Sequence, residues 1–219
     1  MHRKRVSRIK WIVAVALAVS LLVGLGNGLI LGPAAAEEGD QASDGKERQQ
    51  APASGGEAAR GAAPAFVSAR QTLLSAGDAF VLEGYPNLNM GDAEDMWSGY
   101  DDSLEPDGKI VRSLIKFDIS GLPSGEVLDS ATLRVYMAVG WDWPDRYRRF
   151  QAFALTESWA EGTVTWNNQP AYGTGYGIDD ILINDRGWHE FDVTELVSDW
   201  LDSTQANEGI MLRGPEQGP

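Results

Sequence analysis

Apolar and polar positions alternate along two central stretches of the chain, VRSLIKFDIS and SATLRVYMAVG. Their alternate apolar positions are Ile115, Phe117, Ile119, Leu133, Val135 and Met137. A period of two places one face of a strand against a core and leaves the other face mostly polar. Short apolar runs separated by Gly, Pro, Asn and Asp continue this rhythm from residue 66 to residue 213. The pattern predicts an all-β sandwich.

Other runs complete the expected elements. Strands are predicted at residues 79–82, 150–155, 162–166, 188–193 and 210–213. The segment TELVSDWLDS has helical spacing instead, and its apolar face comprises Leu196, Val197, Trp200 and Leu201. Thr194 is expected to cap this helix, and Glu195 suits its first turn. The sequence therefore predicts a sandwich with one short helix.

The N-terminal segment, residues 1–36, has the pattern of an export leader. Five positive charges precede an apolar run from Trp11 to Leu31, and the small residues GPAAA follow it. We expect cleavage after Ala36, with an uncleaved membrane anchor as the alternative, because the run approaches the roughly 20 residues that span a bilayer. Both interpretations place the protein outside the cell, either secreted or tethered to the surface.

The expected domain organisation follows from composition. Residues 37–65 contain no aromatic residue and no Leu, Ile or Val, which predicts a flexible low-complexity linker. Residues 66–214 form the predicted sandwich, and residues 215–219 form a tail.

Charge and cysteine content exclude several kinds of function. All 32 Asp and Glu follow residue 36, as do 13 of the 18 Lys and Arg, so the exported part has a net charge of −19. Nucleic acid and anionic membrane surfaces are therefore not expected partners, because both require a basic surface. The chain contains no cysteine, which excludes disulfides and thiolate chemistry.

Several longer motifs occur in a fixed order, namely DAFV, NMGDAEDMWSGYD, RSLIKFDISGLPSGEVLDSATLRVY, ESWAEGTVTWNNQPAYG, WHEFDVTELVSDWL and NEGIMLRG. In order and approximate spacing the chain resembles the DNRLRE domain, also classified as carbohydrate-binding module family 96, over residues 66–214. The resemblance implies a jelly-roll-type β-sandwich of exported bacterial and archaeal proteins, often found beside polysaccharide-active enzymes. It also implies a carbohydrate ligand, with anionic polysaccharides such as alginate known in the family.

The segment WDWPDRYRRF departs from the family pattern and contains the densest positive cluster of the exported chain. Aromatic rings can stack on sugars, and arginines can bind carboxylates, sulfates or hydroxyls. The candidate carbohydrate-binding residues are Trp141, Trp143, Arg146, Tyr147, Arg148 and Arg149, with Phe150 beside them. The alternative is a hairpin connection with solvated arginines.

Four other tryptophans lie inside the family-like motifs: Trp159, Trp166, Trp188 and Trp200. We expect them to pack within the fold, with ligand contact as the alternative. Thr163, Thr165, Asn167 and Asn168 are expected to satisfy backbone groups around the turn near Trp166.

An acidic run suggests a structural calcium ion bound by Asp92, Asp95, Asp101 and Asp102. The spacing does not match an EF-hand loop, and a solvated acidic loop is the alternative. No cofactor is expected to be required.

Catalysis is not expected. His189 is the one histidine after the leader, its strand pattern suggests an exposed position, and no GxSxG motif is present. The leading hypothesis is an exported, monomeric, non-catalytic module that binds extracellular or cell-wall polysaccharide, such as one containing uronate. The rival is a structural or adhesive surface module that binds a protein or matrix partner without recognising sugar. A uronate lyase or hydrolase is the third possibility.

Overall fold

The computed structural model of the protein describes residues 7–24, 66–101, 109–122, 127–141, 147–182 and 186–217. The elements are β1 (Ser7–Gly24), β2 (Phe66–Leu82), β3 (Asp95–Asp101), β4 (Lys109–Phe117), β5 (Val127–Trp141), β6 (Tyr147–Leu155), the 3-10 turn η1 (Trp166–Asn168), β7 (Tyr172–Leu182), β8 (Gly187–Asp192), α1 (Thr194–Leu201) and β9 (Ile210–Arg213). The predicted fold class, mostly strands with one short helix, is confirmed.

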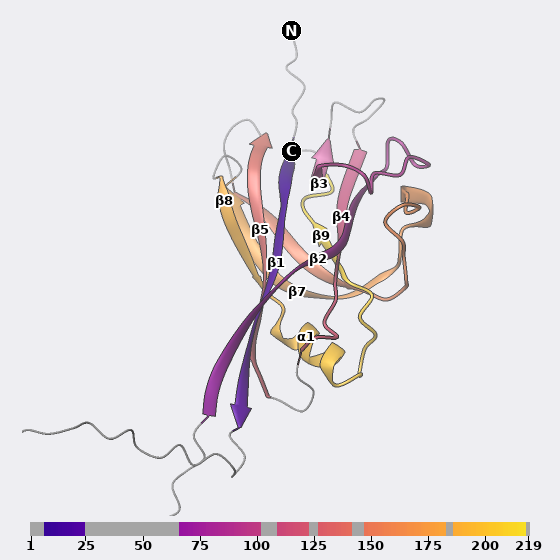
Figure 1. Cartoon of the computed structure of the whole chain (residues 1–219). Helices are drawn as coiled ribbons and strands as arrows, with labels where there is room; N and C mark the ends of the chain where they lie inside the picture. Colours follow the sequence, from indigo (N-terminus) through magenta and orange to yellow (C-terminus); the bar gives the residue numbers. More distant parts are fainter. Residues whose placement is uncertain are drawn as a thin grey trace, which may run out of the picture. The chain divides into compact units, whose positions relative to one another are not determined.

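The strands form one sheet in the order β7-β6-β9-β4-β2-β1-β5-β8, and β3 pairs with β1 and β4 (Figure 1). The two end strands also meet. His189 Nδ1 of β8 lies 3.0 Å from Asp179 Oδ2 of β7. A Cβ on Gly177 of β7 would lie 2.6 Å from the backbone N and O of Asp192. The sheet therefore nearly closes on itself, as a sandwich-like barrel.

The main core fills the inside of this sheet. The predicted alternation in β5 is confirmed, because Leu133, Val135 and Met137 are fully buried while the intervening side chains are only partly buried. The neighbouring β8 adds Phe191, directly opposite Leu133. Helix α1 covers one end of the core with its predicted apolar face, of which Leu196, Val197 and Trp200 are buried. The order of apolar positions thus fixes which side of each strand faces inward.

The chain divides into two units, and the first contains the described residues 7–23 and those from Ser68 onward. Of the second unit only the strand ends at Gly24, Phe66 and Val67 lie among the described residues, so the predicted linker over residues 37–65 lies outside them. Ser7–Gly24, part of the predicted leader, lies in the sheet as β1, with Val19 fully buried. No helix among the described residues is long and apolar enough to cross a membrane. The leader or anchor over residues 1–36 stays a prediction.

Two local predictions were wrong. Residues 162–166 form a turn that leads into η1 instead of a strand. The Asn89 side chain donates hydrogen bonds of 2.7 Å to the carbonyls of Glu161 and Val164, which replaces pairing with a neighbouring strand. Thr194 is the first residue of α1 and not its cap. The carboxylate of Asp192 accepts hydrogen bonds from the Thr194 backbone (2.9 Å) and hydroxyl (2.6 Å), so the cap-like acceptor comes from β8.

Candidate functional site

The Trp-rich segment between β6 and β7 packs on the outer face of the sheet. A second apolar cluster lies there, and its fully or nearly fully buried members are Ala79, Val81, Leu114, Leu155, Val164 and Met211. Trp159 and Trp166 cover this cluster together with Phe153 and Tyr172. Trp159 Nε1 donates to the carbonyl of Glu208 at 3.0 Å. For Trp159, Trp166 and the buried Trp200, the predicted packing role is confirmed.

The polar residues of this segment close the turn, but the Asn167 side chain, contrary to the prediction, donates to the Asn87 side chain at 2.8 Å instead of to a backbone group. The Asn168 side chain accepts a hydrogen bond from the backbone N–H of Thr165 at 2.6 Å and donates one to the carbonyl of Thr163 at 3.1 Å. The backbone N–H of Asn167 donates to the carbonyl of Pro86 at 3.1 Å. These bonds bind the segment to itself and to the loop after β2.

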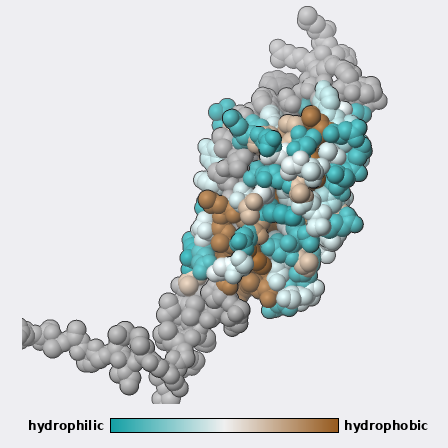
Figure 2. All heavy atoms as spheres, turned by 45° about the vertical axis from the view of Figure 1, so that its right-hand side comes forward, coloured by the Kyte–Doolittle hydropathy of each residue, from teal (hydrophilic) through white to brown (hydrophobic). Residues whose placement is uncertain are grey.

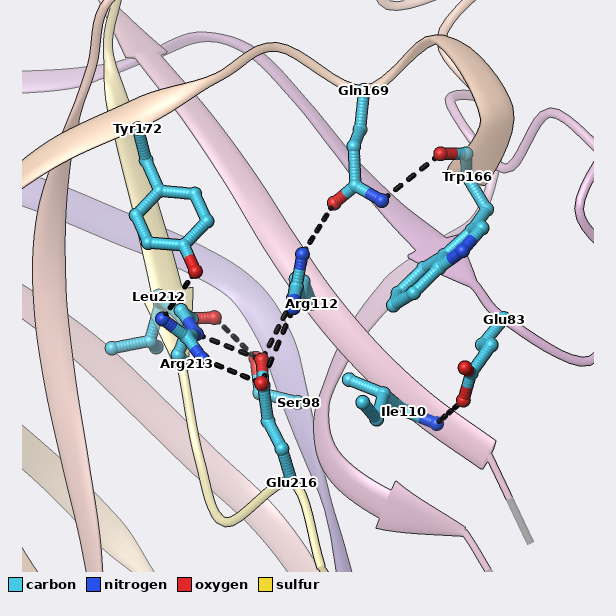
Figure 3. A network of polar contacts seen from close by, with 10 residues as sticks. All are labelled: Glu83, Ser98, Ile110, Arg112, Trp166, Gln169, Tyr172, Leu212, Arg213 and Glu216. Carbon is cyan, nitrogen blue, oxygen red and sulfur yellow. Dashed lines mark hydrogen bonds and ion pairs between the residues drawn. The ribbon is translucent and has the colours of Figure 1, made fainter. Parts of the chain in front are cut away.

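Arg112, Arg213 and Glu216 form a polar network on the same outer face of the sheet (Figure 3). Arg112 Nε donates to Glu216 Oε1 at 2.7 Å, and Arg213 Nε donates to the same atom at 2.7 Å. The Arg112 guanidinium lies 4.8 Å from the Trp166 ring centre, and that of Arg213 lies 4.7 Å from the ring centre of Tyr172. All three charged side chains are at most 20% exposed. The network therefore ties the C-terminal segment to the sheet.

Glu216 is held in its ionised form. Burial alone would raise the pKa of its carboxyl group, but the hydrogen bonds and positive charges of Arg112 and Arg213 outweigh burial and lower the pKa below its usual value. Because both guanidinium groups are engaged with this carboxylate and with neighbouring rings, we interpret the network as structural.

Trp188 differs from the other motif tryptophans because its side chain points outward from β8 and the residue is 45% exposed. The register pairs Trp188 with Tyr136 and Arg134 with Glu190 on β5. The Tyr136 ring meets the Trp188 ring edge to face at 5.5 Å, and the Arg134 guanidinium lies 4.8 Å from the Trp188 ring centre. Arg134 Nε also donates to Glu190 Oε1 at 2.9 Å. We call these four residues the Trp188 face.

A small hollow adjoins the Trp188 face. Its volume is about 230 Å³, and its lining residues are Ala18, Arg70, Thr72, Thr132, Arg134 and Glu190. Arg70 and Thr72 are exposed on β2. The hollow thus combines two guanidinium groups, two hydroxyls and one carboxylate beside a partly exposed indole ring. This set of groups can bind a polar ligand that also has an apolar face.

Comparison with known proteins identifies the domain. Residues 69–219 match the sequence profile described as carbohydrate-binding module family 96. The chain belongs to this family. The Protein DVR-1 homolog of Strongylocentrotus purpuratus is 33% identical over 100 residues, which cover 45% of this chain and 20% of that protein. The similarity to that relative thus spans about a fifth of its length.

The resemblance in the sequence to carbohydrate-binding module family 96 is therefore confirmed, and the family suggests that carbohydrate is the ligand. The structure places one aromatic residue of a family motif, Trp188, where a ligand could reach it. The sequence interpretation missed this residue because it treated the four motif tryptophans alike. The pattern WHEFDV contained the signal, since Phe191 and Val193 are apolar and Trp188 has the opposite parity.

The predicted carbohydrate-binding residues of this family member are only partly described. Trp143 and Arg146 lie outside the described residues, and of Trp141 the structure gives only its place at the end of β5. Tyr147, Arg148 and Arg149 lie on β6 instead of in a loop. Tyr147 is 68% exposed, and Arg149 forms two hydrogen bonds of 2.9 Å with Asp180 of β7. A ligand role for this group stays a prediction.

The sequence interpretation was wrong about the exposure of two residues, Phe150 and His189. Phe150 is buried in the main core and is not part of an exposed cluster, because it follows the inward parity of β6. His189 faces inward opposite Val135, and its side chain is 11% exposed and hydrogen-bonded to Asp179. The expected exposed strand histidine therefore serves the contact between β7 and β8.

The acidic residues proposed for calcium do not form a described cluster. Asp101 is buried on β3, Asp95 accepts a 3.1 Å hydrogen bond from Trp97 Nε1, and Asp92 is exposed. Asp102 lies outside the described residues. Within the part of the chain that the structure describes, no three acidic or histidine side chains are placed to hold a metal ion. A calcium ion involving Asp102 stays a prediction.

Proposed function

We propose that the protein is an exported, non-catalytic module that binds an acidic polysaccharide through the Trp188 face. The observation that supports this best is the partly exposed indole of Trp188, held by Arg134 and Tyr136 beside a polar hollow that contains a second arginine. Family membership supports carbohydrate as the ligand class. The proposed site differs from the WDWPDRYRRF segment expected from the sequence.

The Trp188 face offers two kinds of interaction. The indole ring can stack on the apolar CH surface of a sugar ring, while the neighbouring guanidinium groups can donate hydrogen bonds to carboxylates. Tyr136 limits the ring's movement through its edge contact, so little side-chain freedom is lost on binding. Arg134 is already paired with Glu190, whereas Arg70 is exposed at the rim of the hollow. A uronate carboxylate near Arg70 would thus find a positive partner despite the acidic chain.

Removing the indole should abolish most of the binding. For Trp188→Ala in the full chain, we expect at least a tenfold loss of affinity for alginate, equivalent to about 1.4 kcal/mol, because the stacking surface disappears. Affinity electrophoresis through gels that contain alginate, pectin or a neutral glucan measures this loss. Arg70→Gln should weaken binding to the two uronate gels while leaving migration in the neutral gel unchanged.

The control separates the two candidate sites. Tyr147→Ala combined with Arg149→Ala removes an exposed ring and a cation from β6 and leaves the Trp188 face intact. We expect this double variant to migrate like the wild type. If it loses alginate retardation while Trp188→Ala keeps it, the binding site belongs to the predicted segment and the Trp188 face is not involved.

Export is proposed from the leader pattern alone. Expression in a bacterium followed by mass measurement of the extracytoplasmic protein should give an N-terminus at Glu37. Intact residues 1–36 in a membrane fraction would support the anchor instead. The four residues of the Trp188 face all belong to β5 and β8, so cleavage removes none of them, although it removes β1 and Ala18 from the wall of the hollow.

A further inference from the structure

A second cavity lies away from the Trp188 face. It is a groove of about 730 Å³ between β7 and α1, which we call the α1 groove. Residues 175–178 of β7 line it opposite Thr194, Glu195, Ser198 and Asp199 of α1. It shares no lining residue with the hollow beside Trp188. Its volume falls within the range of about 300–1,000 Å³ that is usual for small-ligand sites.

Acidic and polar residues line the α1 groove beside the apolar residues Leu128 and Ile178. The carboxylates of Asp192, Glu195 and Asp199 line it, and none of its lining residues is Lys, Arg or His. Gln151 and Ser198 add an amide and a hydroxyl, and Tyr176 adds an aromatic ring. The charge of the groove is thus opposite to that of the two arginines beside Trp188.

A close backbone approach and several hydrogen bonds fix the positions of both walls of the α1 groove. A Cβ on Gly177 would come within 2.6 Å of the backbone of Asp192, so β7 lies directly against the end of β8 at this point. Gln151 Nε2 donates to the carbonyl of Tyr176 at 3.2 Å and joins β6 to the same part of β7. On the other wall, Asp192 fixes the first residue of α1 through Thr194. Both walls are therefore positioned before any ligand enters.

Two groups that line the α1 groove, Tyr176 and Asp192, have pKa values shifted by their surroundings. Burial raises the pKa of the Tyr176 hydroxyl, and the negative charges of Asp199 and Glu195 raise it further. The hydrogen bonds from Thr194 lower the pKa of Asp192, so this carboxyl group is ionised at neutral pH. The groove thus combines an aromatic hydroxyl that stays protonated with the ionised carboxylate of Asp192.

We propose that the α1 groove is a second ligand site that binds amine-bearing sugars, such as glucosamine units with free ammonium groups. An ammonium group can donate charge-assisted hydrogen bonds to Glu195 and Asp199, while sugar hydroxyls can bond to Ser198 and Gln151. A uronate would meet like charges in this groove. The net charge of −14 favours the approach of a cationic polymer to any part of the surface, but only a groove provides walls on two sides.

The proposal goes beyond binding at the Trp188 face and does not depend on it. With two sites of opposite charge, one domain can bind an acidic and an amine-bearing polysaccharide at the same time. It can also bind a polymer that contains both kinds of sugar, and two linked contacts then raise the apparent affinity.

The test is calorimetric titration of the full chain with glucosamine oligomers, their fully N-acetylated counterparts and uronate oligomers. We expect the free-amine oligomer to bind at least tenfold more tightly than the acetylated one, which has the same ring without the charge. Glu195→Gln with Asp199→Asn should lower that affinity at least tenfold, whereas Trp188→Ala should leave it unchanged. Ser198 of α1 lines the groove, so Ser198→Lys should also prevent binding of the free-amine oligomer by adding a positive charge there.

The matched control is Asp92→Asn with Glu94→Gln, which removes the same charge from two exposed residues outside the groove. This variant should bind the free-amine oligomer as the wild type does. Equal loss in the control would show attraction to net charge alone and would overturn the proposal. Equal binding of free-amine and acetylated oligomers, or no binding of either, would also overturn it. Loss of amine binding in Trp188→Ala would assign both ligands to one site.

Discussion

Glu216→Ala should lower the free energy of unfolding by about 2–3 kcal/mol, because it leaves Arg112 and Arg213 without their shared counter-charge on a largely buried face. Chemical denaturation at pH 7 measures this loss. The network also fixes the segment after β9, so the two arginines lose their common position as well as a charge partner.

The matched control for Glu216 is an exposed pair of the same chemical type. Arg149 and Asp180 form a two-bond pair at 2.9 Å, but their side chains are 66% and 51% exposed. Asp180→Ala should therefore lower the free energy of unfolding far less than Glu216→Ala does, because solvent screens an exposed pair. A loss as large as that for Glu216→Ala would contradict the argument that burial makes the Glu216 network important.

The same network predicts a pH dependence with a defined sign. The pKa of Glu216 is lower in the folded protein than its ordinary value, so its contribution is fully present above the unfolded-state pKa of about 4.3. It is lost as the pH falls through the folded-state pKa. The stability difference between wild type and Glu216→Gln should thus be constant from pH 7 to pH 5 and shrink below about pH 4. A difference that grows in acid would refute this assignment.

Gly209→Ala should lower the free energy of unfolding at least as much as Glu216→Ala does. Gly209 has φ of +99°, a conformation that side chains disfavour, and a Cβ there would lie 2.4 Å from the carbonyl oxygen of Ile115. Its own carbonyl accepts a 3.0 Å hydrogen bond from the N–H of Leu155, so the backbone cannot move without losing a contact to β6. We expect a loss of about 2–4 kcal/mol, measured by denaturant unfolding.

Gly121→Ala is the control for this substitution, since nothing lies within 4 Å of a Cβ at Gly121. Its effect should stay within about 1 kcal/mol in either direction. If the two alanine variants have equal stability, the close approach of Gly209 to Ile115 does not constrain the fold.

The fold was predictable where local periodicity dominates. Alternation in β5 predicted its inward face, and the short apolar run of β9 predicted its position, although β9 is buried on both faces. In contrast, β7 contains YGTGYG, which has little strand propensity, and it forms because β6 pairs along it. Leu114 was assigned to a mostly polar face, yet it is fully buried under the Trp-rich segment, a contact between distant parts of the chain.

The candidate site likewise combines a position that the local sequence predicts with neighbours that depend on distant parts of the chain. The outward position of Trp188 follows from the parity of β8, so the sequence could have revealed it. Its neighbours Tyr136 and Arg134 come from β5, and their place beside Trp188 depends on the register between two strands separated by a long stretch of chain. The α1 groove was still harder to predict from the sequence, because its lining residues come from β5, β6, β7, β8 and α1.

The meeting of β7 and β8 has a consequence for behaviour on a crowded polymer surface. A strand at the end of an open sheet can pair with the same strand of another molecule and start aggregation. Here the two end strands cover each other, and the partly buried hydrogen bond between His189 and Asp179 joins them. Many copies of the chain that keep β1 between β2 and β5 can thus stay separate molecules when they bind side by side along the proposed polysaccharide ligand.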